Sequence, residues 1–207
     1  MPEITLASLD DRQRKLIENA RIASGCGQLG YVIAVTGEIL REMPACVAAR
    51  RLQRDAQLRQ FERQGGLLAK VKGWAGVVAF LLSPTPKHAG QTLAAAEKLL
   101  ERDPTSVPAL KLLADAALEL GWPETAAFAR EAVRELRPKD QDNLIALGEA
   151  WLGAGRPAEA LQLAEEVLRL RPVDGPGLEL LRQASIAQTV AAGHWDSIGT
   201  FREKLRS

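Results

Sequence analysis

Residues 141–172 read QDNLIALGEAWLGAGRPAEALQLAEEVLRLRP. Apolar residues recur at helical spacing from Leu144 to Leu152 and again after Gly155, which predicts two amphipathic helices. Gly155 suits a left-handed turn between them, and Pro172 ends the second helix. The stretch therefore predicts a hairpin of two antiparallel helices.

Three prolines show that this hairpin repeats along the chain. Pro104, Pro138 and Pro172 follow one another at intervals of 34 residues. Other positions keep the same offset, namely Leu110, Leu144 and Leu178, then Leu113, Leu147 and Leu181, then Gly121 with Gly155, and Ala126 with Ala160. Self-similarity at a fixed period of this length is typical of stacked helical repeats, in which each unit packs on the next.

The best copy resembles the tetratricopeptide-repeat family. It follows the family's spacing of large and small side chains at Leu144, Leu147, Gly148, Trp151, Gly155, Ala160, Ala164 and Pro172. We expect Gly148 and Ala160 to let the two helices of the hairpin cross closely, with Trp151 in the core. Trp122 follows a turn glycine, where we expect it to be partly exposed.

The resemblance implies an all-α fold, a right-handed solenoid of helical hairpins with an atypical amino-terminal region. We expect a single domain over residues 1–207. Its parts are divergent helices over 1–72, a degenerate repeat over 73–106, repeats over 107–140 and 141–174, and a carboxyl-terminal hairpin over 175–207 whose short second helix covers 196–206.

The amino-terminal part departs from the repeat but still predicts helices. Apolar spacing predicts helices over 12–24 and 91–102, and residues 10–44 have the offsets of a divergent hairpin. Pro44 and Pro104 are 60 residues apart, so the register slips, and the helix predicted over 45–64 is expected to be irregular. Because its apolar residues lie on two sides, we expect neighbours on both.

Composition and cysteine spacing limit the kinds of partner and the cellular compartment that we expect. The net charge is +1, which gives no overall attraction to nucleic acid or a membrane surface. The uncharged segment 73–86 is too short to span a bilayer, and the amino terminus lacks the pattern of a secretory signal. Cys26 and Cys46 are expected about 24 Å apart, too far for a disulfide. We therefore expect reduced thiols and a cytoplasmic protein.

No motif in the sequence predicts catalysis, a cofactor or a metal. Residues 25–30, GCGQLG, match a dinucleotide-binding spacing. That motif needs a preceding strand, whereas a helix is predicted here, so a turn between helices is the better interpretation. His88 and His194 have no Asp or Cys at ligand spacing. A catalytic pair with Cys26 or Cys46 would require distant segments to meet.

The family resemblance implies a protein-binding groove formed by the first helices of the repeats. In the family, certain equivalent positions of each first helix, the groove columns, turn their side chains inward. In this chain they are Lys111, Leu112, Asp115, Leu118, Asp142, Ile145, Glu149, Leu152, Glu179, Leu180, Gln183 and Ile186. This acidic rim around an apolar floor favours an amphipathic, basic segment of a scaffolded partner. Family members that grip a carboxyl terminus use Lys, Arg and Asn in these columns. Here only Lys111 is present, so no such clamp is expected.

The charge distribution suggests an alternative face near the amino terminus. Residues 46–72 hold two acidic residues and seven basic ones, which are Arg50, Arg51, Arg54, Arg59, Arg63, Lys70 and Lys72. Residues 96–170 hold fourteen acidic and nine basic residues. These charges are either ordinary solvated helix faces or a site for an acidic partner. A narrower resemblance, to the bacterial kinesin-light-chain group, implies a tubulin-like filament as that partner.

Overall fold

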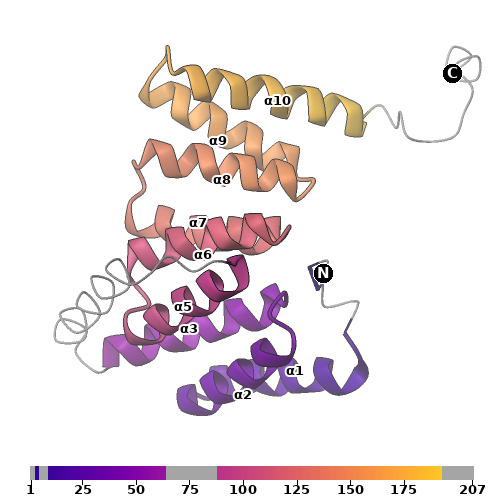
Figure 1. The fold of residues 1–207 in the computed structure, drawn as a ribbon, viewed down its shortest axis with the longest axis vertical. Helices are drawn as coiled ribbons and strands as arrows, with labels where there is room; N and C mark the ends of the chain where they lie inside the picture. Colours follow the sequence, from indigo (N-terminus) through magenta and orange to yellow (C-terminus); the bar gives the residue numbers. More distant parts are fainter. Residues whose placement is uncertain (1–2, 5–8, 64–87, 193–207) are drawn as a thin grey trace, which may run out of the picture. The chain divides into compact units, whose positions relative to one another are not determined.

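The computed structural model describes residues 3–4, 9–63 and 88–192 (Figure 1). Apart from one isolated bridge between Ile4 and Cys46, the regular elements in these ranges are helices. They are α1 (Asp11–Gly25), α2 (Leu29–Glu42), α3 (Val47–Arg63), α5 (Ala89–Arg102), α6 (Val107–Glu119), α7 (Pro123–Leu136), α8 (Gln141–Gly153), α9 (Pro157–Leu170) and α10 (Gly175–Ala192). The predicted all-α fold is confirmed.

Helix boundaries agree with the sequence where both can be compared. The helices predicted over 12–24, 45–64 and 91–102 correspond to α1, α3 and α5. The helix predicted over 196–206, together with Lys70, Lys72 and His194, lies outside the described residues.

A left-handed glycine turn joins the two helices of three hairpins. Gly27, Gly121 and Gly155 have φ of 73°, 75° and 71°, a conformation that costs glycine little. The residue after each glycine donates its N–H to a carbonyl five residues back, in the pairs Gln28 to Ala23, Trp122 to Ala117 and Arg156 to Trp151. This is the Schellman arrangement. The predicted turns at Gly121 and Gly155 are confirmed, and α1 with α2 forms the divergent hairpin expected over 10–44.

A proline turn leads from each second helix into the next first helix. It closes through N–H···O bonds of 3.1 to 3.2 Å from Cys46 to Met43, Ser106 to Asp103, Asp140 to Arg137 and Asp174 to Arg171. The fixed φ of proline suits the second position of such a turn. α3 is entered through this turn like α6, α8 and α10, although its 17 residues make it longer than the 13-residue α6 and α8.

Packing divides the chain into two compact units, Met1–Asn143 and Leu144–Ser207. The single domain over 1–207 stays a prediction. In the first unit α2 packs against α1 and α3, α5 packs on α6, and α6 packs on α7, while α3 also contacts α1 and α7 (Figure 1). The predicted neighbours on two sides of α3 are therefore present. Buried side chains under α1 to α3 include Ile17, Val32, Ile39 and Ala56.

Two amino-terminal residues connect α3 and α7 within the first unit. The Ile4 N–H donates to the Ala45 carbonyl at 3.1 Å. The Glu3 carboxylate accepts the N–H groups of Glu124 and Thr125, at 2.7 and 2.6 Å. These N–H groups belong to the first turn of α7, where intrahelical acceptors are lacking and negative charge is favourable.

In the second unit, glycines allow α10 to approach α8 and α9. A Cβ on Gly148 would lie 2.5 Å from Leu180 Cδ2, and a Cβ on Gly177 would lie 2.8 Å from Val167 Cγ1. A close approach exists at Gly148, where the atoms nearest to the added Cβ belong to Leu180 in the first helix of the following hairpin. The close crossing expected between Gly148 and the second helix of its own hairpin stays a prediction.

The exposed fractions of two tryptophans and of three repeat-equivalent leucines can be compared with the predicted core. Trp151 is 4% exposed, as predicted. Trp122 was expected to be partly exposed, which is wrong: it is 5% exposed and lines a cavity of the first unit. Leu178 is 47% exposed although its repeat equivalents Leu110 and Leu144 are fully buried. The reason is that α10 buries another stripe, Gly177, Leu180 and Ala184, against its described neighbours.

The contact at Gly148 leads to a stability prediction. Gly148→Leu is expected to lower the free energy of unfolding by about 3 kcal/mol or more, because the added atoms would overlap the Leu180 side chain. The matched control is Glu149→Leu, which adds a leucine at the next, exposed position of α8. Thermal and urea unfolding followed by circular dichroism would compare them. Equal stability of the two variants would contradict the packing of α8 on α10.

Candidate functional site

In the second unit, most of the predicted groove columns form two neighbouring stripes. Ile145, Glu149 and Leu152 share one face of α8 because they recur at three- and four-residue steps. Glu179, Gln183 and Ile186 do the same on α10. The contact between Gly148 and Leu180 holds the two helices together. The structure therefore places these six residues on adjoining helices.

The apolar members of these stripes remain accessible. Ile186 is 52% exposed, and Ile145 and Leu152 are half-buried. Val190, 44% exposed, continues the α10 stripe by one turn. The sequence analysis did not include Val190 because the first helices of the other repeats end sooner and have no equivalent position. Its four-residue spacing from Ile186 is the signal that would have found it.

Leu180 was predicted as part of the groove floor, and this is wrong. It is 2% exposed because its side chain fills the space left by Gly148. A side chain packed between two helices cannot contact a partner without separating them. Leu180 therefore positions α10 and belongs to the core.

Local pairing neutralises Glu179. Its carboxylate accepts hydrogen bonds from Arg182 at 2.6 and 2.9 Å and from Gln183 at 2.7 Å. These bonds stabilise the charged form and lower the pKa of Glu179 to about 2. The charge is matched by the Arg182 guanidinium one turn away. Glu149, in contrast, is exposed and has no ion pair to another described residue.

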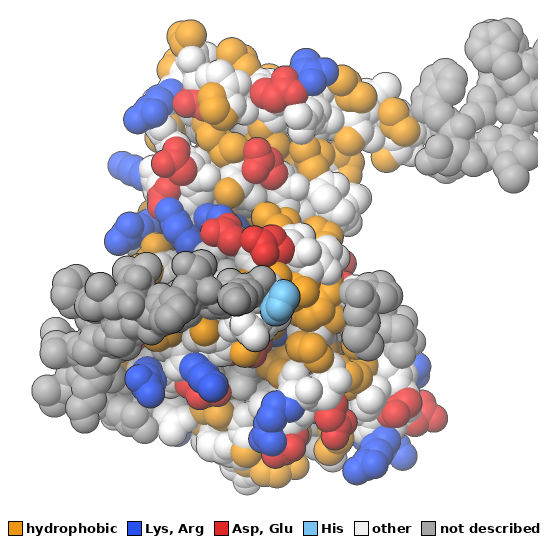
Figure 2. Space-filling view, in the orientation of Figure 1, with side chains coloured by type: hydrophobic (Ala, Val, Ile, Leu, Met, Phe, Trp, Pro, Cys, Tyr) orange, Lys and Arg blue, Asp and Glu red, His pale blue; other side chains and the backbone are white. Residues whose placement is uncertain are grey.

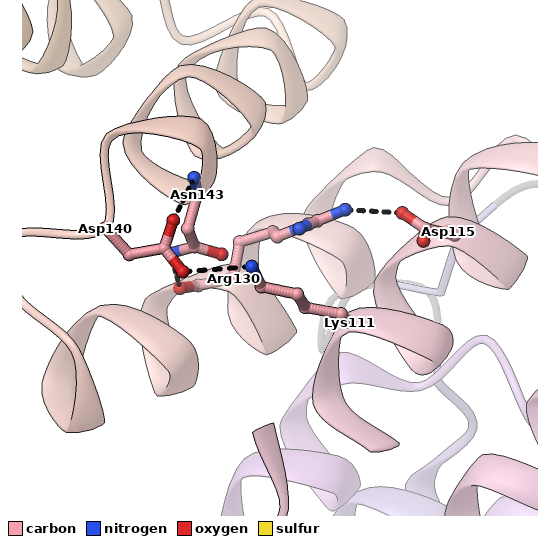
Figure 3. A network of polar contacts seen from close by, with 5 residues as sticks. All are labelled: Lys111, Asp115, Arg130, Asp140 and Asn143. Carbon is pink, nitrogen blue, oxygen red and sulfur yellow. Dashed lines mark hydrogen bonds and ion pairs between the residues drawn. The ribbon is translucent and has the colours of Figure 1, made fainter. Parts of the chain in front are cut away.

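In the first unit, two of the predicted groove residues on α6, Lys111 and Asp115, belong to an internal polar network (Figure 3). The Lys111 ammonium donates to Asp140 Oδ2 at 2.9 Å, and Asp140 Oδ1 accepts the Asn143 N–H at 3.0 Å. Partial burial opposes ionisation of Asp140, but these two hydrogen bonds prevail and lower its pKa. Lys111 is thus engaged within the chain at the junction of α7 and α8.

The same network engages Asp115 (Figure 3). Arg130, 9% exposed, forms an ion pair with the exposed Asp115 carboxylate. The Asn143 side-chain amide donates to the Arg130 carbonyl at 3.0 Å. Of the predicted groove residues on α6, Leu112 is half-buried and Leu118 is 43% exposed.

The predicted acidic rim is consequently weaker than the sequence suggested. Asp115 and Glu179 each have a cation beside them. Among the predicted rim carboxylates, only Asp142 and Glu149 are exposed without an ion pair to another described residue. The pair of Asp115 with Arg130 joins two helices and could not be read from single columns of a repeat. The pair of Glu179 with Arg182 lies within α10 at a three-residue spacing, which is visible in the sequence.

Most arginines of the predicted basic face form hydrogen bonds or ion pairs inside the first unit. Arg50 was expected to be exposed, and this is wrong, because it is 4% exposed. Its Nη2 donates to the Pro44 carbonyl at 2.7 Å and to Glu97 Oε1 at 2.6 Å. Burial lowers the pKa of Arg50 and raises the pKa of Glu97, while their attraction opposes both shifts. The ion pair joins α3 to α5.

Other arginines of α3 also bind the chain itself. The expected exposure of Arg54 is wrong: its side chain is 11% exposed, and Nη1 donates to the Pro104 carbonyl at 2.6 Å. Arg51, half-exposed, lies 3.7 Å from Glu131 and over the Phe128 ring. Arg59 and Arg63 lie close to carbonyls of the α1–α2 turn. Figure 2 shows cationic and acidic side chains interspersed on the visible face of the described residues.

The motif at residues 25–30 lies where a turn was expected. Gly27 has the positive φ of the turn between α1 and α2, so no strand precedes the motif. Cys26 and Cys46 are both free thiols. His88 precedes α5 as its N-cap residue. Within the described ranges, no cluster of His, Cys, Asp and Glu could hold a metal ion.

The chain's own geometry decides the type of fold. Paired helices of 13 and 14 residues repeat with a 34-residue period, and each pair turns at a left-handed glycine. The fold is tetratricopeptide-like. No protein-family model and no curated protein sequence matches the chain.

Solved structures that resemble the chain include tetratricopeptide proteins. The first TPR of Spaghetti (RPAP3), bound to the HSP90 peptide SRMEEVD, is 21% identical with a TM-score of 0.45, over 61% of this chain and 94% of that chain. MamA MSR-1 C2 is 14% identical with a TM-score of 0.44, over 95% and 97%. TTC0263, a thermophilic TPR protein of Thermus thermophilus, is 18% identical with a TM-score of 0.40, over 85% and 98%.

The described helices include none with both the length and the apolar character needed to cross a membrane.

The buried Arg50 gives a prediction with a neighbouring control. Arg50→Ala is expected to lower the free energy of unfolding by about 3 kcal/mol, because it removes the buried guanidinium that binds the partly buried Glu97 carboxylate and the Pro44 carbonyl. Arg51→Ala, at the adjacent half-exposed position, is expected to cost less than about 1 kcal/mol. Urea unfolding would measure both. An Arg50→Ala protein as stable as Arg51→Ala would contradict the buried pair.

The pairing of Glu179 gives a prediction in solution. In a carbon-13 NMR titration of the side-chain carboxyls, Glu179 is expected to titrate with a pKa of about 2. In an Arg182→Ala variant its pKa is expected to return towards that of an ordinary Glu, since the main hydrogen-bond donor is gone. An unshifted Glu179 in the unaltered chain would show that the pair does not persist in solution.

Proposed function

We propose that this chain is a non-catalytic protein-binding module, and that a face formed by α8 and α10 holds an amphipathic, basic segment of another protein. The observation that carries the proposal is the juxtaposition of two accessible stripes on helices joined at Gly148 and Leu180. We call this surface the α8–α10 face, and it consists of Ile145, Glu149, Leu152, Glu179, Gln183, Ile186 and Val190.

The chemistry of the α8–α10 face favours this kind of segment. Ile186 and Val190 are about half-exposed, so a partner's apolar side chains would remove their surface from water. Glu149 offers a carboxylate that no described cation neutralises. A helix presenting apolar residues at three- and four-residue spacing, with Lys or Arg beside them, would satisfy both features.

A carboxylate clamp receives no support from the chain. Lys111 is the one cation in the predicted groove columns, and its ammonium is bonded to Asp140. We therefore propose recognition of an internal segment, without capture of a terminal carboxylate. Both cysteines are free thiols, which supports our proposal that the protein works in a reducing compartment, the cytoplasm.

The test first locates the partner and then weakens its binding. A photo-crosslinking amino acid at Gln183 is expected to capture a partner from the native cell, while the same group at the exposed Gln162 of α9 serves as the control. Mass spectrometry would give the crosslinked segment. The segment would then be synthesised for binding measurements by fluorescence anisotropy.

Charge reversal at one position gives the quantitative prediction. Glu149→Lys is expected to weaken binding of the synthesised segment by about tenfold or more at low salt, because it sets like charges against each other. Glu165→Lys makes the same change in net charge at an exposed position of α9 and is expected to leave the affinity unchanged. Crosslinking from Gln162 alone, or equal effects of the two reversals, would place the binding surface elsewhere.

An acidic, tubulin-like filament stays a prediction as the alternative partner. The burial of Arg50 and Arg54 argues against the basic face as its binding surface. Reversing these arginines would also destabilise the fold, so loss of co-sedimentation in such a variant would not identify a contact. Reversal of the half-exposed Arg51 and Arg59, with the fold checked by circular dichroism, is the appropriate test.

A further inference from the structure

The first unit contains a cavity that the proposed protein-binding face does not use. Its volume is about 570 Å³, and it lies among α2, α3, α5, α6 and α7. Pockets of this size between helices commonly take a small molecule. Small or exposed residues of α2 and α5 contribute to the lining, namely Ala34, Gly37, Gly90 and Ala94.

The wall contributed by α3 is polar. Arg50, Gln53, Arg54 and Gln57 follow at helical spacing along one face of α3 and line the cavity. Leucines and aromatic rings form much of the remaining wall, including Leu93, Leu113, Trp122 and Phe128. A cavity with one polar and one apolar wall matches a molecule that has both kinds of surface.

Arg50 carries hydrogen-bond donors that the chain leaves unsatisfied. Its Nη2 is engaged by Pro44 and Glu97. Its Nε and Nη1 are buried and have no hydrogen-bond partner, although the residue is only 4% exposed. Unpaired buried donors cost free energy, and an anionic acceptor would form charge-assisted hydrogen bonds with them.

Cations outnumber carboxylates in the cavity lining. Arg41, Arg50, Arg54 and Lys98 line it, against the carboxylates of Glu97 and Glu101. Arg41, Arg50 and Arg54 have ion pairs with Glu38, Glu97 and Glu135, which leaves Lys98 as the cation of the described lining without one. The Arg50 side chain is 5% exposed and the Glu97 side chain 32% exposed, and this burial lowers the pKa of Arg50 and raises that of Glu97. In such surroundings an added carboxylate interacts more strongly than it would at the surface.

From this geometry we propose that the cavity binds a small anionic amphiphile. The ligand class is an apolar chain or ring system with one carboxylate. The carboxylate lies at the polar wall beside the Arg50 guanidinium, whose Nε and Nη1 have no partner in the chain, and the apolar body lies against Leu93, Leu113 and Trp122. This site is independent of the α8–α10 face, so either proposal can fail without the other.

Decanoate is a suitable probe, tested on the full chain. Isothermal titration calorimetry is expected to show saturable binding of decanoate about tenfold tighter than that of decyltrimethylammonium, which has the same chain length and the opposite charge. Bromine quenches tryptophan on contact, so 10-bromodecanoate is expected to quench the fluorescence of the chain. In Trp122→Phe the quenching is expected to be lost, because Trp122 lines the cavity.

Two further variants separate loss of the site from loss of the fold. Ala94→Phe is expected to abolish binding, since Ala94 is an exposed residue of the lining and a ring there fills the space. Gln91→Phe, exposed on the same helix and outside the lining, is expected to bind normally, with both variants as stable as the unaltered chain. Absence of decanoate binding, equal binding of the two amphiphiles, or normal binding by Ala94→Phe would each overturn the proposal.

Discussion

Two backbone turns constrain the helices that they join. Within a hairpin the chain reverses at a glycine with φ near +70°, and between hairpins it reverses through a turn that begins with a residue before proline. Because both turns are short and stiff, they determine where each helix ends and which of its faces meets the neighbours. The packing of Leu180 against Gly148 and the juxtaposition of the surface stripes on α8 and α10 follow from these constraints.

The proline turns also accept hydrogen bonds from the arginines of α3. Arg50 donates to the Pro44 carbonyl and Arg54 to the Pro104 carbonyl. Both arginines also lie near glutamates of later helices, Glu97 and Glu135. The basic amino-terminal part and the acidic repeats of the sequence therefore attract each other within the first unit. This internal pairing accounts for much of the charge asymmetry that the sequence offered as a binding site.

The two proposed sites depend on different features of the fold. The α8–α10 face relies on side chains that the repeat leaves outside, such as Ile186 and Val190. The cavity relies on the departure from the repeat, because α3 directs a polar row towards apolar side chains of α5, α6 and α7. A regular array would bury apolar residues at such positions. Arg50 thus contributes to stability through Glu97 and keeps two buried donors without a partner in the chain.

The sequence by itself determined the helical hairpins. Glycine, proline and apolar spacing act over a few residues, so the turns at Gly121 and Gly155 and most helix boundaries were predictable. Six of the twelve predicted groove residues lie on the α8–α10 face for the same reason, since helical spacing assigns them to a side.

Only the tertiary structure decided which side chains of those helices are buried or paired. Arg50 and Leu180 differ from exposed arginines and leucines by their neighbours, Glu97 and Gly148, which lie 47 and 32 residues away along the chain. Trp122 likewise is buried although it follows a turn. Burial and ion pairing depend on contacts between helices distant in sequence, and no local pattern specifies which helix a given side chain will meet.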